Sequence, residues 1–181
     1  MLLVPAGQTN LDVLKSVRDQ TVHALTQAVR GTTQNQALIY RDLIEQDLLP
    51  NSTAGELNSR FSNQSALVAN TPGSLYQQTL PNYQAIGLYG YASLAPSPLI
   101  SMIQFKQGTA VLLAQYFLDA LYADSSEVVG YFDTPIIYQP SQTASILAVA
   151  SAAVGAAAES FVLLGIVVEP AGQSIQPPNV G

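Results

Sequence analysis

Phe161–Val168, which reads FVLLGIVV, is the stretch that decides the fold class. It is a short apolar run closed by Glu169-Pro170, and it therefore predicts a buried β-strand. Working back along the chain, Val128–Tyr138 is rich in β-branched and aromatic residues, which also favour a strand. Pro135 in this run predicts an edge or a bulge, because proline cannot donate a hydrogen bond to a neighbouring strand.

Ser101–Lys106 is a third predicted strand. Its residues partly alternate, with Ile103 and Phe105 on one face and polar residues on the other. Gln107-Gly108 follows as a tight turn. The sequence therefore predicts a mainly β chain, with a C-terminal β-sandwich or jelly-roll-like domain over residues 99–181.

Two segments leave an alternative fold open. Thr109–Tyr122 is apolar on both faces, as a buried strand pair or a buried helix is. Ala144–Ala158 is rich in alanine, which favours a helix. The alternative is therefore an α+β fold, with buried helices at 109–122 and 144–158.

Residues 144–168 together also resemble a membrane anchor in length and apolar character. Glu159 interrupts this run, and an acid inside a bilayer is costly. Lys and Arg are absent from the sequence after residue 106, so no basic anchor flanks the segment. A membrane-associated protein anchored by 144–168 is an alternative that these two observations disfavour.

The first fifty residues are predicted to form a helical N-terminal arm, 1–50. Apolar residues recur at spacings of three and four over 10–30, and a second helix is expected at 35–48, where Pro50 ends it. Residues 51–98 are rich in Asn, Ser, Gln, Gly and Pro, and they are expected to form a loop-rich connector. The connector is too apolar to hang free, so we expect it to lie along a surface.

Charge is scarce in this chain. Asp, Glu, Lys and Arg make up 10% of the residues, against about 25% in a typical protein. Because soluble monomers normally rely on charge, this composition favours burial against other copies or a membrane. The net charge is −6 and the six Lys and Arg residues are dispersed. Nucleic acid is therefore not expected as the main partner, since phosphate binding needs clustered basic residues.

The residues on which most enzyme chemistry depends are few. The sequence has no cysteine, and His23 is its one histidine. Helical spacing places His23 away from the apolar stripe of the first helix, where solvent is expected. Phosphate-loop and dinucleotide-binding motifs are absent from the sequence. We therefore expect the chain not to be an enzyme and to need no cofactor.

Asp124, Glu127 and Asp133 are weak candidates for metal ligands. They are close in sequence, and a loop with three acids can hold calcium through its oxygen atoms. Their spacing does not match the EF-hand pattern, so a solvated loop is the favoured interpretation.

Tyrosines are concentrated in the middle of the chain. Tyrosine is favoured at interfaces because it buries a large ring and keeps a polar tip. Eight of the nine are predicted to lie at an assembly interface: Tyr76, Tyr83, Tyr89, Tyr91, Tyr116, Tyr122, Tyr131 and Tyr138.

These features predict a structural subunit of a large symmetric assembly, with a virus or phage virion as the expected assembly and a capsid or capsid-associated role. The expected partners are copies of the same chain and other structural proteins. A cellular filament or a surface layer fits the same composition. The alternative functions are the membrane-associated protein, in an extracellular or membrane location, and a small-ligand or glycan-binding β-domain. Symmetry, copy number and host stay open.

Overall fold

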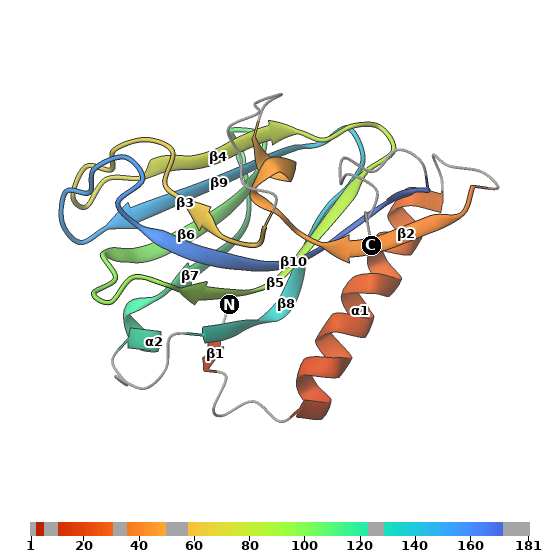
Figure 1. Ribbon diagram of the computed structural model, residues 1–181, viewed down its shortest axis with the longest axis horizontal. Coiled ribbons are helices and arrows are strands. Elements are labelled where there is room, and N and C mark those ends of the chain that lie inside the picture. The colour runs from red at the N-terminus through yellow and green to blue at the C-terminus, as the bar shows by residue number, and fades with distance from the viewer. Residues whose placement is uncertain (1–2, 6–10, 31–35, 50–57, 123–128, 172–181) are drawn as a thin grey trace.

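The computed structural model describes residues 3–5, 11–30, 36–49, 58–122 and 129–171. Two antiparallel sheets pack face to face, and a long N-terminal helix lies on the outside of the larger sheet (Figure 1). The prediction of a mainly β chain with a β-sandwich and a helical N-terminal arm is therefore confirmed.

The larger sheet has six strands, in the order β1-β8-β5-β10-β2, with β3 also paired to β10. Its strands are β1 (Leu3–Pro5), β2 (Leu38–Asp42), β3 (Phe61–Ser62), β5 (Ala85–Ser93), β8 (Val129–Tyr138) and β10 (Ser160–Pro170). The smaller sheet has four strands, in the order β4-β9-β6-β7. Its strands are β4 (Gly73–Thr79), β6 (Ile100–Gln107), β7 (Val111–Phe117) and β9 (Thr143–Ala150). The helical elements are α1 (Leu11–Arg30), the 3₁₀ turn η2 (Glu45–Leu48) and α2 (Asp119–Tyr122).

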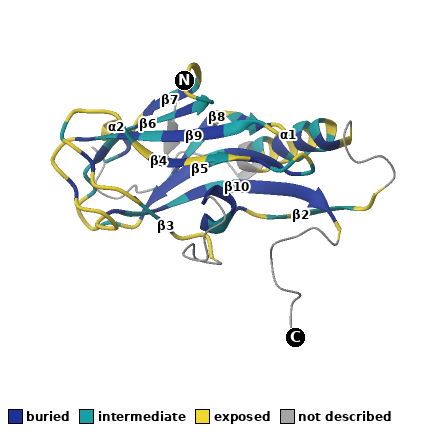
Figure 2. Cartoon of the chain, turned by 90° about the horizontal axis from the view of Figure 1, so that it is seen from above, coloured by how far each residue is buried: buried dark blue, intermediate teal, exposed yellow. Residues whose placement is uncertain are grey.

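β10 contains the predicted strand Phe161–Val168 and lies inside the six-stranded sheet. It pairs with β5 along one edge, while β2 and β3 pair with the two ends of its other edge. Leu163 and Val167 pack into the core between the sheets, whereas Ile166 and Val168 pack under α1. Figure 2 shows β10 buried along most of its length, which explains why this strand is apolar on both faces.

α1 confirms the predicted helix at 10–30. Thr21, Leu25 and Val29 recur every four residues and are fully buried against the outer face of the six-stranded sheet. Gly87 on β5 makes this close approach possible, because a Cβ atom there would lie 2.4 Å from Cγ2 of Thr21. The helical arm thus packs on the sheet of its own chain.

Stacked aromatic rings fill the core between the sheets. The rings of Tyr116 and Phe132 stack with centroids 4.3 Å apart, and Phe105 meets Phe132 edge-on at 5.4 Å. These rings come from β7, β8 and β6, so they join the two sheets at one end of the sandwich.

The second helix predicted at 35–48 is wrong. Leu38–Asp42 forms β2, which pairs with residues 166–170 of β10, and only Glu45–Leu48 is helical, as a single 3₁₀ turn. The apolar residues at helical spacing are divided between β2 and η2. Backbone pairing of β2 with β10 overrides the local helical pattern.

The buried helices of the alternative fold are also wrong. Residues 109–122 form strand β7 followed by the four-residue α2, and 144–158 begins with strand β9. In β9 the buried alanines Ala144, Ala148 and Ala150 share a two-residue period with Ile146, which is the period of a strand. Hydrogen bonding to β4 and β6 on its two edges overrides the helical preference of alanine.

The expected loop-rich connector 51–98 holds strands. β4 is an edge of the four-stranded sheet, and β5 lies between β8 and β10 in the larger one. The content of Asn, Ser, Gln, Gly and Pro predicted a loop here, but the two glycines of β5 allow close packing: an added Cβ would meet Thr21 at Gly87 and backbone at Gly90. Pro135 lies where β8 bulges away from β5, as predicted.

Residues 144–168, which the membrane alternative requires, supply β9 and β10 to different sheets. Among the helices that the structure describes, none combines the length and the apolar character needed to cross a membrane.

Candidate functional site: an uncharged sheet with an open edge

β7 is an edge strand with exposed apolar side chains. Within the described part of the chain, β7 pairs only with β6. Val111, Leu112 and Phe117 are 53%, 51% and 63% exposed, although each is a residue that proteins usually bury. An edge of this kind presents unpaired backbone N–H and C=O groups beside apolar surface, so it is suited to pairing with another strand.

The outer face of the four-stranded sheet continues this surface. Met102 on β6 lies opposite Phe117 on one side and opposite Val149 of β9 on the other. Beside this row, the Gln104 side-chain amide donates a hydrogen bond to Oε1 of Gln115 at 2.9 Å. Apolar side chains and neutral amides therefore run across three neighbouring strands up to the open edge.

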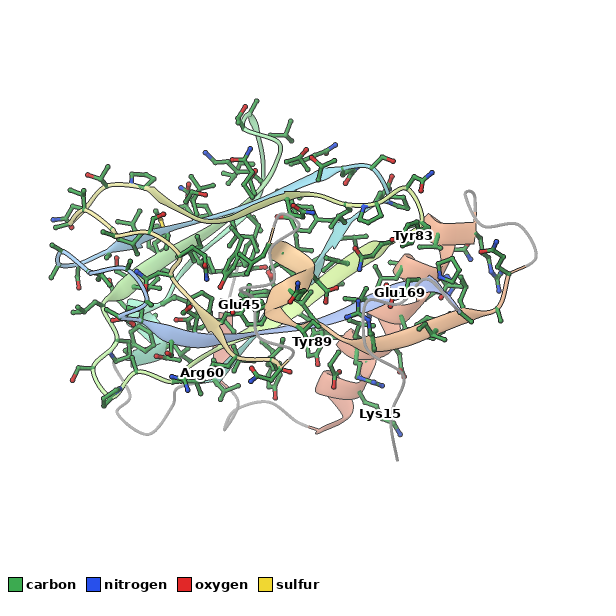
Figure 3. All side chains as sticks on the ribbon, turned by 45° about the horizontal axis from the view of Figure 1, so that its top comes forward. Lys15, Glu45, Arg60, Tyr83, Tyr89 and Glu169 are labelled. Carbon is green, nitrogen blue, oxygen red and sulfur yellow. The ribbon has the colours of Figure 1, made fainter. Side chains whose placement is uncertain are left out.

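The four-stranded sheet is almost free of charge. Lys106 is its one charged residue, and its four strands contain no acid. Figure 3 labels four charged residues outside this sheet: Lys15 on α1, Glu45 on η2, Arg60 just before β3, and Glu169 on β10. Apart from Lys106, the charged residues thus lie outside the strands of this sheet, in a chain whose net charge is −6.

A buried ion cluster lies at the end of the six-stranded sheet where β2 meets β10. The Arg41 guanidinium contacts Oδ1 of Asp47 at 2.6 Å and Oε1 of Glu169 at 2.7 Å. The Arg41 side chain is 7% exposed, and both carboxylates are fully buried. Burial alone would lower the pKa of Arg41, but hydrogen bonds and charges from Asp47 and Glu169 more than offset this and raise the pKa above its ordinary value.

This cluster serves the fold. Gln84 donates a hydrogen bond to Oδ1 of Asp47 at 3.1 Å, and the backbone N–H of Ile44 donates to Oδ2 of the same carboxylate at 3.0 Å. Each charge therefore has partners from its own chain, and the cluster ties β2 and η2 to β10.

A second buried acid, Glu45, is held in the same way. The Tyr76 hydroxyl donates to Oε1 of Glu45 at 2.5 Å, and the backbone N–H of Ser62 donates to the same atom at 3.1 Å. Burial, followed by this carboxylate, raises the pKa of Tyr76 above its ordinary value. The contact joins η2, β3 and β4 and closes one side of the sandwich.

The structure divides the eight predicted interface tyrosines into two groups. Tyr76, Tyr91, Tyr116 and Tyr138 are buried in the core of their own chain, where burial raises the pKa of each. These four rings therefore pack internally and are not offered to a partner. Tyr83, Tyr89, Tyr122 and Tyr131 are half-buried, and for them an interface role stays a prediction. The hollow beside Tyr89 measures about 120 Å³, below the roughly 300–1,000 Å³ of small-molecule pockets.

The candidate metal ligands are not brought together by the described residues. Asp133 is exposed on β8 and accepts a hydrogen bond from the Tyr116 hydroxyl at 3.3 Å. Asp124 and Glu127 lie outside the described residues. Within the described ranges, no three potential metal ligands from His, Asp and Glu side chains gather at one point. His23 is exposed on α1, as predicted, and the absence of enzymatic activity stays a prediction.

Sequence reasoning missed the open edge. It located the apolar stretch 109–122 but placed both of its faces in a core. One indication was available, because residues 107–118 contain no charge and no proline, which are two of the features that protect edge strands.

Comparisons with known proteins do not identify the chain. No family model matches it, and no curated protein matches it. One similar solved chain belongs to a structure described as "Bacillus endospore appendages form a novel family of disulfide-linked pili". The identity is 10%, the TM-score is 0.32, and the match covers 77% of this chain and 91% of the other. A similarity this weak assigns neither fold nor function.

Proposed function

We propose that this protein is a structural subunit that assembles with copies of itself, and that the four-stranded sheet is its contact surface. The observation that carries the proposal is the β7 edge, where three apolar side chains are each more than half exposed on a strand without charge. Edge strands of proteins that stay monomeric are usually shortened, charged, bulged or covered. β7 has one bulge, at Leu113, but no charge. Burial against another copy would explain why β7 has no charge.

The contact is expected to be weak when it forms singly. Covering the exposed parts of three apolar side chains on each of two copies supplies on the order of 6 kcal/mol, which corresponds to a dissociation constant between about 1 μM and about 1 mM. Association therefore requires high protein concentration or many repeats of the contact, as a symmetric assembly provides.

A virus or phage particle is the specific assembly that we propose, with a capsid or capsid-associated role in the virion and other structural proteins as further neighbours. The composition and the open edge support this proposal. The helical arm adds no support, because α1 packs on its own sheet. A cellular filament and a surface layer are the competing assemblies, and electron microscopy of the assembled material distinguishes them by symmetry.

The test is the mass of the intact chain in solution, measured by light scattering from about 1 μM to about 1 mM, the range in which contacts of this strength form. We expect the mean mass to rise above 19.2 kDa as the concentration increases. A constant mass of 19.2 kDa over the whole range would show that the chain does not assemble by itself.

A further inference from the structure

We propose that β7 pairs with β7 of a second copy, antiparallel and across a two-fold axis, so that two four-stranded sheets become one eight-stranded sheet. This inference rests on the proposed function, self-assembly, and names the strand and the partner that carry it.

Charge at the two ends of β7 favours a second copy in antiparallel orientation. Lys106 lies opposite Leu112 near the start of β7, and the exposed Asp119 follows two residues after its end. Antiparallel pairing brings the acidic end of one strand to the basic end of the other, and the two-fold axis repeats this contact. A parallel arrangement would place like charges together.

Side-chain chemistry favours β7 as the partner strand over β4, the other edge of the same sheet. The exposed side chains of β4 are Ser74, Gln77 and Thr79, all polar. Apolar residues gain more from covering one another than from covering polar groups that need water. Pairing β7 with β7 covers apolar side chains with apolar side chains.

Strand geometry selects the side chains that meet. β7 has a bulge at Leu113, so Leu112 lies opposite Lys106 and Phe117 lies opposite Met102, and both exposed side chains lie on the outer face of the sheet. Antiparallel pairing across a two-fold axis brings the Leu112 end of one strand to the Phe117 end of the partner strand, and the same contact occurs a second time. Such an interface is self-complementary and closes at a dimer, which then serves as the building unit of the larger assembly.

The test is an exchange of charge across the proposed pair. Leu112→Lys places a lysine near Phe117 of the partner subunit, and Phe117→Glu places a glutamate near Leu112 of the partner subunit. Each variant alone covers a charge with an apolar side chain, so we expect the dimer dissociation constant to rise about thirty-fold or more. In an equimolar mixture, one lysine meets one glutamate and the other pair stays native. We therefore expect heterodimers with a dissociation constant within about three-fold of the unmodified chain.

Val68→Lys is the matched control. Val68 is 67% exposed on the loop before β4, so the change adds the same charge at an equally open apolar position away from β7. We expect the control to dimerise like the unmodified chain. Because all three sites are more than half exposed, the variants are expected to fold, and their urea unfolding curves in dilute solution check this.

Hydrogen exchange on the unmodified chain gives a second measurement that needs no substitution. The amides at the open edge of β7 are expected to become protected as concentration rises, whereas those at the edge of β4 are not. If both charge variants assemble as tightly as the unmodified chain, or if the protected amides lie at β4, the β7 pairing is overturned and self-assembly still stands. Failure of the mixture to restore dimers overturns the antiparallel arrangement. A chain that stays monomeric throughout overturns the proposed function as well.

Discussion

The two sheets share one core but differ on their outer faces. The six-stranded sheet is covered by α1, and its charges are paired inside the fold at Arg41, Asp47 and Glu169. The four-stranded sheet has almost no charge, and its edge β7 leaves Phe117 largely exposed. The charges of this molecule are therefore unevenly distributed. The outer face of one sheet is covered by α1 of the same chain, whereas the edge of the other sheet leaves apolar side chains exposed.

The largest effect on the free energy of unfolding is expected at the buried ion cluster of the six-stranded sheet. Arg41→Met leaves Asp47 and Glu169 buried without their cation, so we expect the free energy of unfolding to fall by about 3–5 kcal/mol. Urea unfolding measures this. Arg60→Met is the control: Arg60 is exposed and donates to Oγ of Ser160 at 3.1 Å, so we expect a loss below about 1 kcal/mol. Equal losses in the two variants would mean that the buried cluster stabilises no more than a surface contact.

The second prediction compares the two outer faces directly. Leu25→Ala removes a fully buried side chain between α1 and the six-stranded sheet, and we expect a loss of about 3 kcal/mol. Phe117→Ala removes a larger side chain from the outer face of the four-stranded sheet. In dilute monomer we expect the free energy of unfolding to change by less than about 0.5 kcal/mol. Urea unfolding of both variants at low concentration measures the contrast. A large loss of stability for Phe117→Ala in the monomer would mean that Phe117 is already packed against its own chain.

The smallest predicted effect is on the pH dependence of stability, and it comes from Tyr122, which lies where the two sheets meet. Tyr122 follows β7 and donates its hydroxyl to that of Tyr91 on β5 at 3.2 Å. Burial raises the pKa of Tyr122 to about 12, from an ordinary value of 10.0. The folded chain therefore keeps a proton that the unfolded chain releases, and this contribution to stability is complete below pH 10 and is lost as pH rises from 10 to 12.

Tyr122→Phe removes this dependence. Because Tyr122 is half-buried and partly screened by solvent, we expect the loss of stability between pH 10 and pH 12 to shrink by about 1 kcal/mol. Unfolding in urea at a series of alkaline pH values measures the slope. Tyr83→Phe is the control, and a slope reduced equally in both variants would contradict a specific role for Tyr122.

Strands and helices with a single, strong pattern were predictable from the sequence. β10 is an apolar run with a clear end, β6 alternates, and α1 carries an apolar stripe at helical spacing. The failures at 35–48 and 144–158 have one cause. Short apolar or alanine-rich segments fit a helix and a strand equally well, and only pairing with distant strands decides between them. β2 is stabilised by pairing with β10, and β9 by pairing with β4 and β6. These pairings are not visible in the local sequence pattern.

The candidate site was predictable only as a property of the whole chain. Scarce charge predicted a surface suited to contact, and four of the eight tyrosines predicted to lie at it are buried in the core instead. Tyr91, Tyr116 and Tyr138 are buried in the core, where Tyr91 stacks on Phe161 within the larger sheet and Tyr116 stacks on Phe132 across the two sheets. The open edge depends on which strand lies last in the sheet, and that order is a result of the fold.

The position of β10 in the chain has a consequence for synthesis on the ribosome. β2, β3 and β5 are all made before β10, and each reaches its place in the sheet by pairing with it. All four strands of the smaller sheet, by contrast, are complete once residue 150 has emerged. A growing chain therefore carries β5 with one side unpaired until residues 160–170 follow. Slow translation late in the message would prolong this state, in which the nascent chain is most in need of a chaperone.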